Sequence, residues 1–153
     1  MKKQLLIFAL SLITYLAQSQ VVPNIDWVKT FNPRFQRANA PSALDANNNV
    51  YVTGYISTSP SNQDLIVLKY DSLGTLLWSY IYNNGGNDAG KAIKVSSTGN
   101  VYVTGQSYDA ASNFDYYTIK LSPTGSVIWS ARYDYFGSTD AAVDIKIDEL
   151  AAK

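Results

Sequence analysis

NVYVTG, at positions 49–54, occurs a second time, unchanged, at positions 100–105, so the two copies lie 51 residues apart. A self-similar period of roughly 50 residues is the signature of a repeat array. We therefore divide the chain into unit 27–77, unit 78–128 and a partial unit, 129–153. Several other residue pairs and one trio keep the same spacing: Trp27, Trp78 and Trp129; Asp64 and Asp115; Lys69 and Lys120; Gly74 and Gly125.

Each unit divides into four runs with the composition of β-strands. In the second unit these runs are 89–97, 100–107, 114–122 and 126–133, and they are rich in Val, Ile, Tyr and Thr, which favour strands. Turn sequences separate the runs, and Gly99 closes one of them in the left-handed conformation that such turns need. Asn48 takes the equivalent place in the first unit, which Asn tolerates. We expect four-stranded antiparallel sheets.

Side-chain alternation indicates how these sheets are covered. In 75–82, Trp78 and Tyr80 share one face of the strand. In 64–70 both faces are apolar, so this strand is expected to be covered on both sides. Stacked propeller blades require such sheets. The sequence therefore predicts an all-β fold of β-propeller-type repeats in four-stranded antiparallel blades, about two blades plus partial blades at each end. A β-sandwich is the alternative.

Five segments carry a family resemblance: Trp78 to Tyr82, Gly85 to Val95, Gly99 to Gly105, Asp115 to Lys120 and Gly125 to Trp129. They resemble the bacterial β-propeller repeat family abbreviated SBBP. The first unit departs from this pattern, since residues 34–42 lack its Gly and Asp and include Pro41. The resemblance implies a secreted or cell-surface propeller, and it implies no established catalytic residues.

The first residues have the features of a secretory signal peptide. Lys2 and Lys3 precede the apolar run 5–17, and Ala17-Gln18-Ser19 suits cleavage after Ser19. The run is shorter than the roughly 20 apolar residues of a membrane span. We therefore expect signal peptide 1–19, a secreted or cell-surface location, and a single repeat region, 20–153, with no membrane span once the signal is removed.

The composition excludes several kinds of chemistry. The chain has no His and no Cys, and Glu149 is its only Glu. Ser-His-Asp and Cys-His catalysis are therefore excluded, as are disulfides and zinc sites built on His or Cys. The formal net charge of 0 becomes −2 when Lys2 and Lys3 are removed, which gives nucleic-acid binding no support. We predict a protein without enzymatic activity, catalytic residues, cofactor or metal.

Some residues have two interpretations. Asp88 and Asp140 precede equivalent strands and could form a ring of metal or ligand carboxylates, but capping of loop N–H groups is favoured. Asp64 and Asp115 are interpreted in the same way. The three tryptophans could stack on sugars, but core packing between sheets is favoured. Loop residues are the better candidates for weak ligand contact: Tyr108, Asp109, Tyr135 and Phe136.

These observations favour a binding or adhesion scaffold, or a module of a larger exported protein, whose loops contact an unknown extracellular carbohydrate or protein. The alternative is the propeller domain of a polysaccharide-active or quinone-dependent enzyme whose active residues lie outside this chain. Residues 137–147 match 85–95, so a third repeat begins near the C-terminus. Because propellers close with four to eight blades, we expect further blades in a longer chain.

Overall fold

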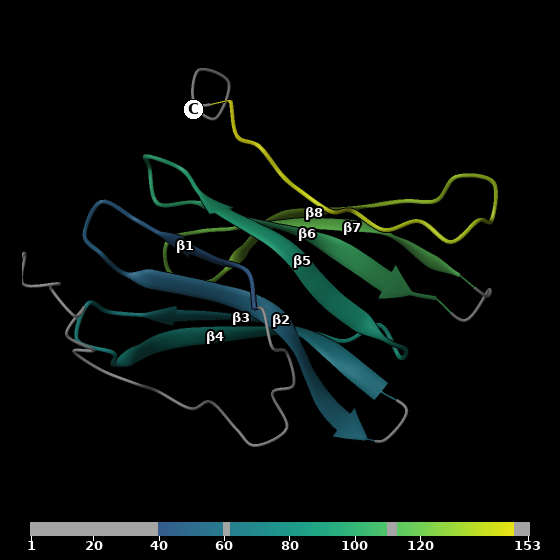
Figure 1. Ribbon diagram of the computed structural model, residues 1–153, viewed down its shortest axis with the longest axis horizontal. Helices are drawn as coiled ribbons and strands as arrows, with labels where there is room; N and C mark the ends of the chain where they lie inside the picture. The colour runs from purple at the N-terminus through teal and green to yellow at the C-terminus, as the bar shows by residue number, and fades with distance from the viewer. Residues whose placement is uncertain (1–39, 60–61, 110–112, 149–153) are drawn as a thin grey trace, which may run out of the picture.

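The computed structural model describes residues 40–59, 62–109 and 113–148 (Figure 1). The predicted signal peptide 1–19 and Trp27 lie outside these residues, so the structure does not bear on them. The described residues form β-strands and contain no helix, and therefore no helix long and apolar enough to cross a membrane. The prediction of an all-β fold is confirmed.

The strands form two four-stranded antiparallel sheets, one from each repeat unit. The first sheet has the order β1 (Ser42–Leu44), β2 (Val50–Ser59), β3 (Asn62–Tyr70) and β4 (Leu76–Tyr82). The second has the order β5 (Asp88–Val95), β6 (Val101–Tyr108), β7 (Phe114–Leu121) and β8 (Val127–Tyr133). Figure 1 shows the sheets stacked, with β5 lying over β2. Sequence order and spatial order agree within each sheet, as expected for hairpins with short turns.

The predicted turns have the backbone that their sequences demand. Gly74, Gly99 and Gly125 have φ values of 79°, 80° and 86°, and Asn48 has a φ of 60°. In each turn a backbone N–H donates back across the hairpin, as Gly125 does to the Ser122 carbonyl at 3.0 Å. These left-handed positions set the hairpin register and end each strand at its turn. The strand boundaries predicted for the second unit are correct to within two residues.

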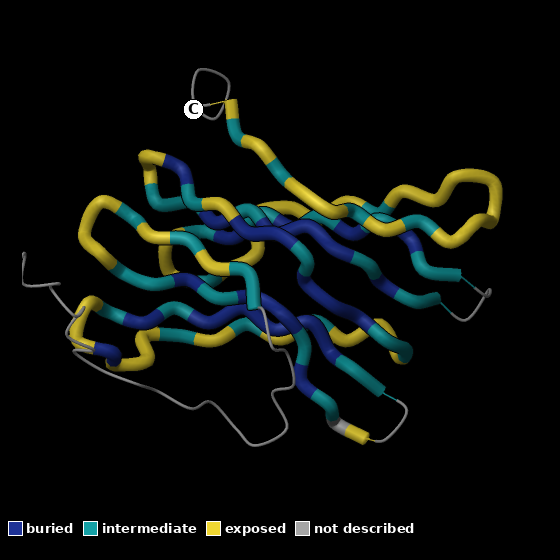
Figure 2. The backbone as a smooth tube through the Cα atoms, viewed as in Figure 1, coloured by how far each residue is buried: buried dark blue, intermediate teal, exposed yellow. Residues whose placement is uncertain are grey.

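The core lies between the two sheets. Tyr51, Leu65 and Val67 extend from the first sheet towards apolar side chains of the second. The residues of the second sheet in this core are Ile93, Val101, Val103, Tyr117, Ile119 and Leu121. Figure 2 shows the buried residues running along the middle of both sheets. Apolar burial between the sheets is the dominant stabilising term for a chain without disulfides.

The outer faces of the two sheets differ. On the first sheet, Ile66 and Leu68 belong to a second buried cluster, which confirms that β3 is covered on both sides. On the second sheet, β8 exposes Trp129 and Tyr133. Trp78 packs against the core, which confirms the predicted core position for this residue. Trp129, at the same repeat position, is 42% exposed among the described residues.

Two predicted first strands are short or unpaired. β1 contains only three residues, because Pro41 has no N–H to donate to the ladder. Residues 140–148, which match β5 in sequence, form no strand, and Val143 is 86% exposed. β5 pairs with β6, the strand that follows it, and no equivalent of β6 follows within the described residues. A strand at that position has no ladder partner to stabilise it.

Candidate functional site

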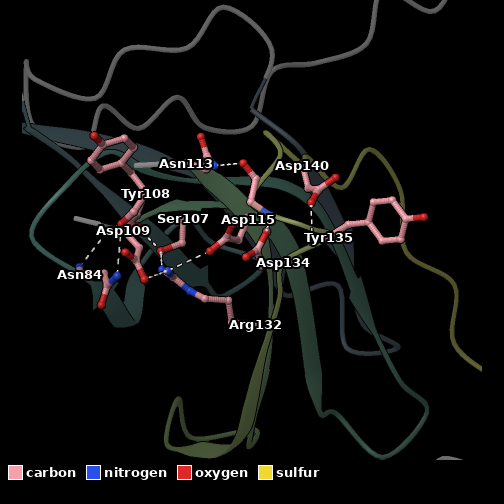
Figure 3. A network of polar contacts seen from close by, with 12 residues as sticks. Asn84, Ser107, Tyr108, Asp109, Asn113, Asp115, Arg132, Asp134, Tyr135 and Asp140 are labelled. Atoms are coloured by element: carbon pink, nitrogen blue, oxygen red, sulfur yellow. Dashed lines mark hydrogen bonds and ion pairs between the residues drawn. The ribbon is translucent and has the colours of Figure 1, made fainter. Parts of the chain in front are cut away.

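The loops that precede β5, follow β6 and follow β8 meet at one end of the second sheet, which we call the loop end. The N–H of Tyr108 donates to the carbonyl of Asn87 at 3.0 Å, and the N–H of Asp140 donates to the carbonyl of Phe114 at 2.6 Å. The amide of Asn113 donates to the carbonyl of Gly137. These bonds hold the three loops together, as Figure 3 shows for the polar side chains between them.

Arg132, on β8, is the centre of this polar network (Figure 3). Its guanidinium contacts Asp109 at 3.0 Å and Asp115 at 3.1 Å, and it also donates to the Ser107 hydroxyl. Asp115 lies opposite Ser107 in the β6–β7 ladder, so one long side chain from β8 reaches both. The planar guanidinium with several donors suits such a multiple contact better than an ammonium would.

Asp88 is the most deeply buried acid of the network. It has no exposed surface, and its carboxylate accepts hydrogen bonds from the Ser107 hydroxyl and, at 2.8 Å, from the N–H of Asn84. Burial raises the pKa of Asp88 above its ordinary value, although these bonds and the nearby Arg132 charge oppose the rise. Burial likewise raises the pKa of Asp115, against the attraction of Arg132.

The acids selected from the sequence have mainly structural contacts. Asp88 and Asp140 both cap loop N–H groups, since the N–H of Tyr135 donates to Asp140 at 2.9 Å. The capping interpretation is therefore confirmed for both. Asp115 pairs with Arg132, whereas Asp64 is buried with one carboxylate oxygen that accepts no hydrogen bond. Within the ranges that the structure describes, no three acidic side chains are grouped so as to hold a metal ion.

All four candidate contact residues lie at the loop end, but they divide into two pairs. Tyr108 and Asp109 are largely engaged: the Tyr108 ring packs edge-on against Phe114 at 5.4 Å, and Asp109 pairs with Arg132. Tyr135 and Phe136 are 54% and 87% exposed, with ring centroids 4.6 Å apart. The second pair is therefore the more exposed one.

Phe136 also has an unfavourable backbone conformation. Its φ is 55°, a value that bulky residues rarely adopt. Such a conformation costs of order 1–2 kcal/mol, and costs of this kind concentrate at functional positions. The loop therefore holds an aromatic ring in solvent at the expense of stability.

Sequence reasoning missed Arg132 and Ser107, although the repeat contained a signal for both. The equivalent positions of the first unit, 51 residues earlier, hold Ile81 and Ile56. A polar residue at a position that is apolar in the other unit is not needed for the fold that the two units share. Comparison of the two units at each position would have found both.

A cavity lies at the opposite end of the sheets from the loop end. This cavity of about 260 Å³ lies between the turn at 45–49, the turn at 96–99 and Pro123. Its carboxylate, Asp45, accepts hydrogen bonds from Asn49 and from the Tyr51 hydroxyl at 3.0 Å. The acid of the cavity is thus used to hold the turn.

The geometry defines a class of protein: an all-β protein of two stacked four-stranded antiparallel sheets built from one repeated unit. No family model matches the chain, and no curated protein matches it. Function therefore has to be argued from the repeat and from the loop end.

Proposed function

We propose that this chain is a non-catalytic, exported scaffold of β-propeller-type blades that binds an extracellular carbohydrate through the loop end of its second sheet. The observation that carries the binding proposal is the exposed ring pair of Tyr135 and Phe136 beside a polar network. Residues 1–19 support export, because their pattern is that of a secretory signal peptide.

The propeller assignment is supported by the equivalence of the two sheets. Each unit supplies one four-stranded antiparallel sheet, with the same strand order and the same turn positions. Propellers are built from such sheets arranged around an axis. The SBBP-type resemblance of the second unit agrees with this assignment.

A carbohydrate ligand is favoured by the chemistry around the two rings. Aromatic faces provide apolar contact area, and sugars also need hydrogen-bond donors and acceptors beside it. Asp109 and Asn113 carry such groups in the loop that follows β6, and Arg132 presents its guanidinium from β8 at the same end of the sheet. A protein ligand is the second possibility, because exposed aromatic residues also form the centres of protein interfaces.

The enzyme alternative has less support. The carboxylates at the loop end are engaged by Arg132 or by N–H groups of the loops. A general acid or base has to reach its substrate with a free carboxyl group. A catalytic role would therefore require residues that this arrangement does not offer.

A glycan array probed with the purified chain tests the proposal. The double substitution Tyr135→Ala and Phe136→Ala is expected to abolish binding, whereas Leu73→Ala is the matched control. Leu73 is also an exposed apolar residue, at 79%, but lies in a turn at the opposite end of the sheets. Binding that survives the double substitution, or no binding to any glycan, would refute the proposed site.

A further inference from the structure

The two sheets carry the same three-residue cluster. In the first cluster, Lys69 pairs with Trp78 across β3 and β4, and its ammonium lies 5.0 Å from the ring centre of Tyr51. The Tyr51 and Trp78 rings are edge-on, with centroids 6.1 Å apart. The first cluster thus combines an aromatic pair with a cation–π contact.

The second cluster, Tyr102, Lys120 and Trp129, repeats this geometry one unit later. Lys120 pairs with Trp129 across β7 and β8, and its ammonium lies 5.1 Å from the Tyr102 ring centre. The Tyr102 and Trp129 rings are 6.4 Å apart and again edge-on. The two clusters therefore offer the same chemical surface.

The second sheet covers the first cluster. The indole N–H of Trp78 donates to the carbonyl of Pro123 at 3.0 Å, and the Lys69 ammonium lies 3.4 Å from the same oxygen. Gly125 lies directly on the indole, since a Cβ there would be 2.9 Å from Trp78 Cδ2. A single turn, 122–126, thus accepts hydrogen bonds from both the indole and the ammonium of the first cluster.

The second cluster faces away from the first sheet and is not covered in this way. Trp129 is 42% exposed. Tyr133, four residues later on the same face of β8, is 58% exposed. Contiguous apolar exposure of this kind marks an interaction surface on a soluble protein. The second cluster therefore has the same chemistry as the first cluster, which the turn 122–126 of the second sheet covers. The second cluster has no such cover among the described residues.

We propose that the outer face of the second sheet, centred on the second cluster, is the docking site for a third four-stranded sheet of the same repeat in the same chain. Residues 140–147 form its first strand, because they match β5 in sequence and belong to no β-ladder among the described residues. The turn of the third sheet accepts a hydrogen bond from the indole N–H of Trp129, as Pro123 accepts one from Trp78. The inference rests on the propeller-type repeat proposed above and names the partner of this face.

One residue of the third repeat differs in size from its counterpart at the interface between the first two sheets. A Cβ on Gly90 would strike the side chain of Thr53 across the sheet interface. Ala142 stands at the equivalent place in the third repeat, opposite Thr104. The third sheet therefore lies slightly farther from β6 at this point than the second sheet lies from β2.

The test uses a chain extended in register: residues 1–147 followed by a second copy of residues 96–139. The appended copy supplies equivalents of β6, β7 and β8. Hydrogen exchange of the indole N–H groups is followed by NMR, with each signal assigned by Trp→Phe substitution. Exchange at Trp129 is expected to slow roughly tenfold relative to the original chain, the factor of one net hydrogen bond. Trp78 is the internal control, because its indole N–H already has its acceptor in both chains.

Two variants sharpen the result. Gly125→Val, placed only in the appended copy, should restore fast exchange at Trp129, because the new side chain would collide with the indole. Ala142→Gly should slow exchange further, since it removes the Cβ opposite Thr104.

Each outcome decides the proposal. Fast exchange at Trp129 in the extended chain would overturn the proposal. This holds whether the appended strands fold elsewhere or stay unfolded. Slow exchange at Trp129 in the original chain, accompanied by dimerisation, would show that a second copy is the occupant and would also overturn it. The glycan test uses the original chain and different residues, so failure of either proposal is recognised separately.

Discussion

Gly125→Ala tests the stacking of the two sheets directly. At this position φ is 86°, so a side chain costs about 1–2 kcal/mol for the left-handed backbone alone. The added Cβ would also lie 2.9 Å from Cδ2 and 3.1 Å from Cε3 of Trp78. Overpacking of this kind typically costs a further 1–3 kcal/mol, roughly. We therefore expect a total loss of about 2–5 kcal/mol.

Gly99→Ala is the matched control. Its φ of 80° imposes the same backbone cost, but the nearest neighbour of the new Cβ is Pro123 Cγ at 3.3 Å, a close contact that a shift of a few tenths of an ångström relieves. The expected loss is therefore close to the backbone cost, about 1–2 kcal/mol. The two variants should differ by roughly 1–3 kcal/mol, the cost of the collision with Trp78.

Urea unfolding monitored by far-UV circular dichroism measures both losses. With a slope of about 1–3 kcal/mol/M, the difference is on the order of 1 M in the midpoint. In a Trp78→Ala background the excess cost at Gly125 should disappear, as a double-mutant cycle requires for residues in contact. Equal losses for Gly125→Ala and Gly99→Ala, or strict additivity with Trp78→Ala, would show that the turn does not rest on the indole.

Three further predictions concern the loop end. Arg132→Met should lower the free energy of unfolding by about 2–3 kcal/mol at pH 7, because it leaves Asp115 buried without its counter-charge. Since burial raises the pKa of Asp115, protonation relieves this penalty, and urea titrations should show a smaller loss near pH 4. Asp88 has a raised pKa in the folded protein, so its contribution to stability is present at acid pH and is lost as the pH rises through the folded pKa. As the pH is lowered from 7 to 4, the free energy of unfolding of the native chain should therefore rise relative to that of Asp88→Asn. If the difference between the two chains does not change with pH, the raised pKa is contradicted. Phe136→Gly should raise the free energy of unfolding by about 0.5–1 kcal/mol, because it relieves the left-handed backbone at little packing cost. Thermal melts measure this gain. A loss of stability would show that the Phe136 ring packs against the protein.

Much of the local structure followed from the sequence. The 51-residue spacing of NVYVTG and of Trp78 and Trp129 gave the two units, and turn glycines such as Gly99 located the hairpins. These features are local: a left-handed residue fixes a turn, and alternation with period two assigns each side chain to a face of its strand. The four strands of the second unit could therefore be predicted with nearly correct ends.

The contacts of the loop end could not be predicted in the same way. Asp109 was selected because it lies in a loop, but its partner Arg132 comes from a strand 23 residues later. Tyr108 was selected with it, and its ring is half-buried and packs edge-on against Phe114. Such contacts depend on the register between strands and on the reach of long side chains, which a single strand pattern does not specify.

Trp78 and Trp129 show which properties the sequence predicts and which properties depend on tertiary packing. Sequence alone determined that both residues hold the same position in their repeat units, within equivalent strands. Only the packing of the sheets decided that Trp78 donates its indole N–H to Pro123 while Trp129 remains 42% exposed. The reason is physical: alternation states which side of a sheet a residue occupies, whereas burial requires a second surface to be placed against that side.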